Sequence, residues 1–255
     1  MEPHFLGVPN VTPLIFSGLA FAAFCTALAG IMLGAAGGLV LIAIMAMVLP
    51  PAVLVPVHTL IQLGASCSRT MMMWRYVMRG ALLPFLAGAA IGAAVGARVF
   101  LELPVTALQG IMAVFILVIA WLPKIGRIGN LHGRFAVLGF GATFLGMFVS
   151  ATGTLLAPFV ASASPDRRNH SATIGALMML VHISKLVAFG VLGIAVGAYI
   201  PLVLAMIAGS ALGNFVGRHA LDKIPEKVFR IGFKLLMTVL GIRMLWIVAR
   251  GAGWI

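Results

Sequence analysis

The sequence predicts an all-α integral membrane protein made of two inverted repeats, each with a broken helix or helical hairpin plus three transmembrane helices. Three observations predict this fold: the composition, an internal duplication and the distribution of basic residues. Hydrophobic residues make up 62% of the chain and charged residues 9%, and the mean hydropathy is +1.17. A soluble domain carries about 25% charged residues. So little charge cannot cover a water-facing surface, and most of the chain is expected to lie in lipid.

Long stretches without Asp, Glu, Lys or Arg give the candidate spans, because a helix needs about 20 apolar residues to cross the bilayer. One such stretch runs from Glu2 to Arg69 and another from Lys185 to Arg218. Glycine, proline and charge divide these stretches. The predicted spans lie at about 12–48, 54–77, 80–100 and 105–123 in the first half, and at about 135–163, 171–196, 200–217 and 230–249 in the second.

An internal duplication relates the two halves. Residues 30–41 read GIMLGAAGGLVL and residues 146–157 read GMFVSATGTLLA, which pairs Gly30 with Gly146 at an offset of 116 residues. The same offset pairs Arg69 with Lys185, and IGAAVGARV (91–99) resembles AGSALGNFV (208–216) at an offset of 117. Three elements in register indicate two repeats, at 1–126 and 127–255, within one integrated transmembrane domain.

The first span of each repeat is too long and too rich in glycine for one ordinary helix. It is predicted to break, or to turn back as a hairpin, at its glycine motif. If 12–48 and 135–163 are hairpins, the basic loops near 75–79, 124–134, 167–168 and 218–227 all lie on one side of the membrane, as the positive-inside rule requires. If every segment crosses once, these loops divide between both sides. The hairpin topology inverts the second repeat, an arrangement that recurs in secondary transporters, and it places both termini outside the cytoplasm.

The two glycine motifs are the first candidate site. Small residues bring membrane helices together, so helix packing explains the glycines equally well. In the functional interpretation, helix N-termini at the two breaks offer N–H groups and a positive dipole end to an anion, next to a central cavity. The predicted cradle of backbone and hydroxyl groups consists of Gly34, Gly37, Gly38, Ser150, Thr152, Gly153 and Thr154.

Charged and titratable residues within the spans are the second candidate site. Lys185 lies near the middle of its span, where a charge costs about 2.5–3.5 kcal/mol, and the chain has only five acidic residues. Lys185 is therefore predicted to provide the countercharge for an anionic substrate, with His182 and Arg69 as further substrate-binding candidates. Arg69 fits a cytoplasmic basic cluster equally well. His58 and His182 each fit a hydrogen-bonded structural histidine better than a proton carrier, and Asn214 fits an interhelical hydrogen bond or a cavity donor.

Several function classes find no support in the sequence. The charge of +12 is scattered over short loops, which does not indicate nucleic-acid binding. Cys25 and Cys67 have neither metal-ligand spacing nor a disulfide pattern. No nucleophile, P-loop or metalloprotease motif is found, so we expect no enzyme, cofactor or metal site. The hairpin plan resembles that of aquaporin-type channels, but their Asn-Pro-Ala signatures are missing from this sequence.

Two long segments carry a family resemblance. The motif GIMLGAAGGLVL, followed by VPVHTLIQLGASCSRTMMMWRYVMRG with Thr59, resembles the first half of the TauE/SafE sulfite exporter family, also called the toluene sulfonate uptake permeases. In the second half, GMFVSATGTLLAP and NHSATIGALMMLVHISKLVAFGVLG resemble the family pattern with Thr173. The likeness runs through nearly the whole chain. It departs from the family's denser glycine at residues 35–36 and 151–152.

The resemblance implies a multi-pass transporter of the bacterial cell inner membrane. Its expected substrates are sulfur-containing anions such as sulfite, sulfoacetate or other organosulfonates, moved by alternating access at a midplane site, with export as the expected direction. A passive anion channel on the same scaffold is the alternative, and a membrane enzyme or scaffold would show no solute flux. The expected partners are the small anion and the lipid bilayer, and a homodimer is compatible with this plan.

Overall fold

The computed structural model describes residues 4–33, 37–49, 51–104, 133–149, 152–164, 166–191, 193 and 196–220, together with some residues between 107 and 121 and between 235 and 250. The first half contains the strands β1 (His4–Phe5) and β2 (Val8–Pro9), then α1 (Pro13–Leu33), α2 (Gly37–Met45), α3 (Pro51–Met72) and α4 (Leu82–Glu102). The second half contains α6 (Arg134–Val149), α7 (Gly153–Ala163), α8 (Arg167–Val191) and α9 (Ile200–Ala220). Short 3-10 turns lie at Trp74–Tyr76, Arg79–Ala81 and Gly197–Tyr199.

Helices dominate the described part of the chain, and four segments of it are long and apolar enough to cross a membrane: Pro13–Ile31, Arg79–Phe100, Arg167–Val191 and Gly197–His219. The prediction of an all-α membrane protein is therefore confirmed. Helix α3 has 22 residues and contains Pro56 and Arg69, and its length of about 33 Å matches the thickness of the bilayer core. Most of the predicted spans at 105–123 and 230–249 lies outside the described residues.

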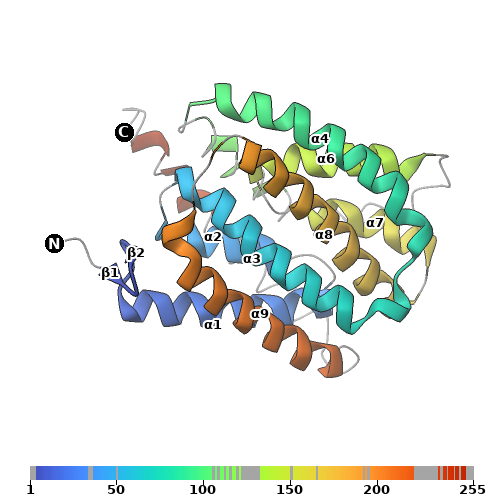
Figure 1. Ribbon diagram of the computed structural model, residues 1–255, viewed down its shortest axis with the longest axis horizontal. Coiled ribbons are helices and arrows are strands. Elements are labelled where there is room, and N and C mark those ends of the chain that lie inside the picture. The colour runs from blue at the N-terminus through green and yellow to red at the C-terminus, as the bar shows by residue number, and fades with distance from the viewer. Residues whose placement is uncertain are drawn as a thin grey trace.

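The predicted interruptions occur at both glycine motifs. Helix α1 ends at Leu33 and α2 begins at Gly37, and α6 ends at Val149 before α7 begins at Gly153. Gly37 returns to the side of α1, where a Cβ atom on it would overlap the carbonyl oxygen of Thr26 and lie 3.1 Å from the Cα of Gly30. Figure 1 shows α1 and α3 both running from left to right, so the chain turns back between them. The first half contains the predicted hairpin.

Two glycine seams hold the long helices together. Along each seam, a side-chain Cβ on the glycine would crowd the backbone of the partner helix. The contacts advance by four residues on both helices at once, so each pair is parallel. The seams place Gly88 with Ala136, Gly92 with Phe140 and Gly96 with Phe144 between α4 and α6, and Gly209 with Ala20, Gly213 with Phe24 and Gly217 with Leu28 between α9 and α1. The first helix of each half thus packs on the fourth helix of the other.

The seams adjust the predicted register of the fourth helices. The sequence similarity pairs Gly92 with Gly209, but the packing makes Gly88 the equivalent of Gly209, because Gly88 contacts Ala136 and Gly209 contacts Ala20. The offset becomes 121 residues in place of 117. Glycines recur at every fourth position in both helices, so the sequence matches itself equally well after a shift of about one helical turn.

Helices α3 and α8 cross at the centre in opposite directions. Near one end, Thr70 and Arg69 lie against Gly175, and the Met78 N–H donates to Thr173 Oγ1 over 3.0 Å. Further along α3, His58 lies within electrostatic range of Lys185. Residue numbers therefore fall along α8 as they rise along α3. Figure 1 shows this opposition, and the same opposition between α4 and α9. These directions support an inverted second repeat.

The described basic loop residues gather at one end of the bundle, which we call the basic end. Arg168 Nη1 donates to the Tyr76 hydroxyl over 3.3 Å, and Arg134 Nη1 donates to Ser162 Oγ over 3.4 Å. Arg218 closes α9, which runs parallel to α1. This arrangement is the one that the hairpin topology predicts. Residues 124, 127, 223 and 227 lie outside the described part.

Candidate functional site

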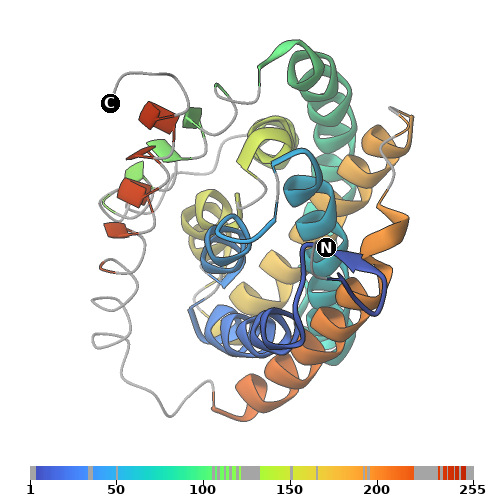
Figure 2. The same cartoon turned by 90° about the vertical axis from the view of Figure 1, so that its left-hand side faces the viewer.

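A small pocket lies where α2 and α7 begin. Its volume is about 40 Å³, and one water molecule needs at least about 10–15 Å³. Gly37 and Gly38 of α2 and Gly153 of α7 form part of its wall. Figure 2, which views the bundle from its left-hand side in Figure 1, shows the blue α2 and the yellow α7 overlapping near the centre. Gly37, Gly38 and Gly153 thus bring the starts of both broken helices to one pocket.

Residues from both halves of the chain line the pocket. At the offset of 116 residues, three pairs of equivalent positions line it: Gly37 with Gly153, Gln62 with Met178, and Ser66 with His182. In inverted-repeat transporters, substrate sites form at the repeat interface near the bilayer midplane. A pocket lined by both halves is what the predicted pair of inverted repeats requires of a substrate site.

The first backbone N–H groups of a helix generally lack partners within it, and both α2 and α7 begin at this pocket. These helices have 9 and 11 residues, and their positive dipole ends meet at the pocket. Thr152, the N-cap residue of α7, is fully buried and makes no capping hydrogen bond with its side chain. Its hydroxyl has no hydrogen-bond partner among the described residues. The site therefore has spare polar groups at a helix start.

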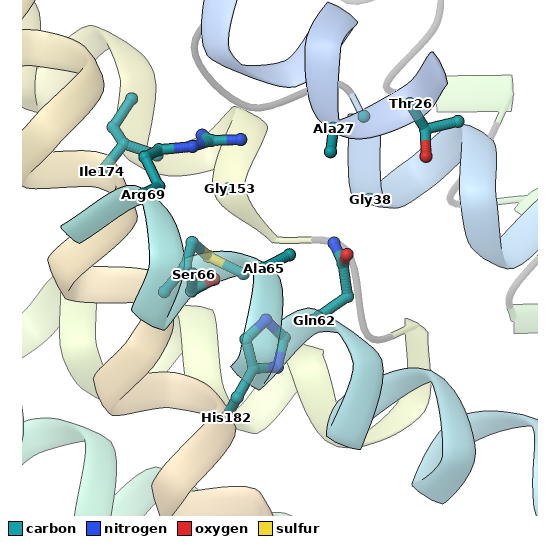
Figure 3. Close-up of a pocket in the computed structure, with 12 residues that line it drawn as sticks. Thr26, Ala27, Gly38, Gln62, Ala65, Ser66, Arg69, Gly153, Ile174 and His182 are labelled. Carbon is teal, nitrogen blue, oxygen red and sulfur yellow. The ribbon is translucent and has the colours of Figure 1, made fainter. Parts of the chain in front are cut away.

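His182 provides the second, independent sign of a ligand site. Its side chain is 0% exposed, and neither ring nitrogen has a hydrogen-bond partner in the described part of the chain. Buried polar groups are almost always hydrogen-bonded, and leaving one unpaired costs about 1–3 kcal/mol. Figure 3 shows the imidazole with Gln62, Ser66 and Arg69 around a common space. A polar guest in that space would provide the missing partner.

Arg69 supplies the positive charge of the pocket. Its side chain is partly buried and lines the pocket from α3, and its Nη2 atom lies 3.0 Å from the position that a Cβ of Gly30 would occupy. The Nε atom is buried and has no hydrogen-bond partner among the described residues. None of the residues that line the pocket is acidic. The pocket is therefore suited to an anion, which a guanidinium, backbone N–H groups, an amide and a hydroxyl can bind together.

Lys185 is fully buried but does not line the pocket. Its Cδ atom lies 3.7 Å from the position that a Cβ of Gly146 would occupy, and its Nζ lies 5.9 Å from the centre of the Phe189 ring. It is within electrostatic range of both His58 and His182. His58 Nε2 donates to the Gly38 carbonyl oxygen over 3.0 Å, which agrees with the structural interpretation of that histidine.

The structure brings together about half of the predicted site residues. Gly37, Gly38, Arg69, Gly153 and His182 line the pocket, whereas Thr152 is buried at the N-cap of α7 and Lys185 lies about one turn beyond His182 on α8. Gly34, Ser150 and the side chain of Thr154 lie outside the described residues. Asn214 donates to the Ala65 carbonyl and to Ser68 Oγ over 2.8 Å each, so it serves as an interhelical link.

Three polar lining residues were not predicted: Thr26, Gln62 and Ser66. Gln62, Ser66 and Arg69 follow the i, i+4, i+7 spacing of a single helix face, within a span that is otherwise mostly apolar. This polar stripe was present in the sequence and would have identified the face of α3 that lines the site. Thr26 sits singly in an apolar run and gives no such signal.

Comparisons with known proteins identify one family. The family model described as "Sulfite exporter TauE/SafE" matches residues 19–244. No curated protein and no solved structure matches the chain. Within the described residues, no group of three or more His, Cys, Asp or Glu side chains that could hold a metal ion is found.

Proposed function

The chain belongs to the TauE/SafE family of sulfite exporters, and from that premise we propose that the pocket between α2 and α7 is the substrate site of a secondary transporter for sulfur-containing anions. The family assigns a multi-pass membrane transporter of the sulfite exporter type. The observation that carries the more specific proposal is one pocket at the repeat interface, with two helix N-termini, Arg69 and the unpartnered His182 around it. Bacterial inner-membrane localisation is part of the proposal. The family match gives no support for a homodimer.

The size of the pocket favours a small oxyanion. Its 40 Å³ corresponds to a few water molecules at about 10–15 Å³ each. Sulfite is the most compact of the expected anions and therefore demands the least movement of the lining side chains. A compact oxyanion could accept hydrogen bonds from Arg69, Gln62 and backbone N–H groups at once, which makes sulfite the first candidate.

The charge distribution supports a direction for loading. Short basic loops normally face the cytoplasm, which makes the basic end the cytoplasmic one. Arg69 lies in the last turn of α3, on the side of the pocket nearer to this end. An exporter would then load its anion past Arg69, and alternating access would expose the pocket to the opposite face.

Equilibrium binding of sulfite to purified protein tests the site. Arg69→Gln removes a charged donor, and a hydrogen bond to a charged group contributes about 1.5–3 kcal/mol, so the affinity should fall about 10-fold or more. Arg98→Gln makes the same substitution at an exposed position on α4 and should leave binding unchanged. Equal binding by wild type and Arg69→Gln would contradict the site.

Flux into proteoliposomes separates the transporter from a passive anion channel. A transporter shows saturable uptake that is accelerated by unlabelled sulfite on the other side, because each inward turn is coupled to an outward one. A channel shows conductance that does not saturate at similar concentrations. Wild-type protein that moves no sulfur oxyanion in either assay would refute the proposed function.

A further inference from the structure

The two cations in the central helices occupy equivalent places in the two repeats. Arg69 lies against Gly30: a Cβ on this glycine would be 3.0 Å from Arg69 Nη2. Lys185 lies against Gly146: a Cβ there would be 3.7 Å from Lys185 Cδ. Arg69 and Lys185, like Gly30 and Gly146, are 116 residues apart. Each repeat therefore places one long cationic side chain against the same glycine of its own first helix.

These two places lie on opposite sides of the pocket. Helices α3 and α8 are antiparallel, so Arg69 lies towards the basic end and Lys185 towards the opposite end. Ser66 precedes Arg69 by three residues and His182 precedes Lys185 by three, and both Ser66 and His182 line the pocket. Polar groups thus continue from Arg69 through the pocket to Lys185 along the crossing of the two helices.

The two ends differ in how they are closed. Arg69 is partly exposed and reaches the pocket, whereas Lys185 is 0% exposed. Lys185 Nζ lies 5.9 Å from the centre of the Phe189 ring. Phe189 of α8 packs against Phe100 of α4 with ring centres 5.7 Å apart, and Phe100 packs against Phe148 of α6 with ring centres 6.4 Å apart. Phe148 and Phe189 are almost fully buried. The residue equivalent to Phe189 at the basic end is Met73. An aromatic ring therefore lies next to Lys185, and a methionine occupies the equivalent position near Arg69.

We propose that Lys185 and Gly146 form a second anion station, equivalent to the Arg69 station, and that Phe100, Phe148 and Phe189 close it in the conformation seen here. The substrate reaches this station when the protein opens towards the face opposite the basic end. The inference rests on the proposed function and assigns the same oxyanion to both stations. Arginine offers a planar fork for bidentate binding and lysine a single point charge, so the anion is held in a fixed orientation where it loads and more loosely where it leaves.

The first experiment compares binding with exchange for Lys185→Gln and Arg69→Gln, using sulfite as the probe. In Lys185→Gln, equilibrium binding to the pocket should weaken less than 10-fold, while sulfite exchange in proteoliposomes should fall at least 10-fold. Arg69→Gln should lose both binding and exchange. Exchange at the wild-type rate in Lys185→Gln would overturn the second station, and so would a loss of binding as large as that of Arg69→Gln. A wild-type protein that neither binds nor exchanges sulfite would refute the proposed function instead.

The second experiment tests the closure with a thiol-specific, membrane-impermeant reagent. Lys185→Cys is introduced after Cys25 and Cys67 are replaced by serine, and it should react slowly from either face. Adding Phe148→Ala, or the milder Phe100→Leu should the first variant not fold, should raise the labelling rate from the face opposite the basic end at least 10-fold. Met73→Ala at the equivalent position and Phe21→Ala on the lipid-exposed side of α1 serve as controls and should leave the rate unchanged. Equal labelling rates in the Phe variants and in these controls would overturn the closure.

Discussion

Gly37 and Gly38, at the start of α2, have no room for a side chain, and the reason differs between them. A Cβ on Gly37 would overlap the backbone carbonyl oxygen of Thr26, which cannot move without shifting α1. A Cβ on Gly38 would overlap only the Nε2 atom of Gln62, at the far end of a flexible side chain. Gly37 therefore allows the hairpin to close, and Gly38 allows the Gln62 amide to enter the pocket.

Alanine substitutions should separate these two roles. Gly37→Ala should reduce the yield of folded protein, because overpacking against backbone costs about 1–3 kcal/mol. Gly38→Ala should fold normally but bind sulfite about 10-fold more weakly, because Gln62 must withdraw its donor from the anion. Size-exclusion profiles and equilibrium binding measure the two effects, with Gly18→Ala, where a Cβ meets open space, as the control. Normal binding by Gly38→Ala would show that Gln62 does not contact the anion.

The sequence predicted the residue types of the site better than their distances from one another. Lys185 was the preferred countercharge because its position along the chain is central to a span, yet Arg69 is the cation that lines the pocket. Position along a span gives depth in the membrane, but the direction in which a side chain points depends on how α3 and α8 cross. That crossing depends on contacts between the halves, such as Arg69 with Gly175, and no periodicity within one helix encodes it.

Among the helices, glycines one turn apart determine which pairs can approach to backbone contact. Gly139 of α6 faces α4, where a Cβ would overlap the carbonyl oxygen of Phe85 and lie 3.0 Å from the amide nitrogen of Ala89. Gly141, two residues further along, has no atom within 4 Å of its Cβ position. The same helix therefore offers one glycine that the packing requires and one that it does not.

Gly139→Ala should destabilise the protein, and Gly141→Ala should not. Overpacking at Gly139 is expected to cost about 1–3 kcal/mol and to lower the apparent unfolding temperature by a few degrees. The Gly141 position, where a Cβ meets open space, gains helix propensity from alanine, which is about 1 kcal/mol better than glycine in water. Thermal unfolding of both variants in detergent measures the difference, and equal unfolding temperatures would exclude a tight α4–α6 seam.

The sequence located these elements and their glycine pattern but not the register between the repeats. Helix ends at Leu33 and Val149 follow from the glycine motifs, and the interruption in each first span was predicted from its length. The four-residue glycine repeat of α4 and α9 fits at more than one offset, so only the contacts of Gly88 and Gly209 with their partner helices fix it. A repeated motif identifies a packing face and leaves its alignment open.

In the molecule as a whole, the distribution of loop charge predicted the topology, and the described loops agree with it. Arg79 precedes α4, and Arg168 contacts Tyr76 from the start of α8, so loops from both halves meet at the basic end. Figure 1 shows both repeats spanning the same length of the bundle, with the N-terminal strands at the end away from the α8 start. The side on which a loop lies depends on charge summed over the loop, which the sequence gives directly, so the topology stays a prediction that rests on loop charge.

Cysteine accessibility in cells should reproduce this topology. In the background without Cys25 and Cys67, Gly80→Cys and Asp166→Cys should both react only when the cytoplasmic face is exposed, because both positions are exposed at the basic end. Ala198→Cys, exposed in the turn before α9, should react from outside. Labelling of Gly80→Cys and Asp166→Cys from opposite faces would reject the hairpin topology.

The parallel pairing of α1 with α9 imposes a delay during biosynthesis. Ala20 contacts Gly209, so the surface of α1 that faces this seam is made about 190 residues before its partner. At a synthesis rate of about 5–20 residues per second, α1 spends roughly 10–40 s in the membrane without that neighbour. During this interval lipid tails must cover a surface that later contacts glycine backbone. The sequence of α1, which has no charged residue anywhere along its length, suits a helix that has to wait in lipid for its partner.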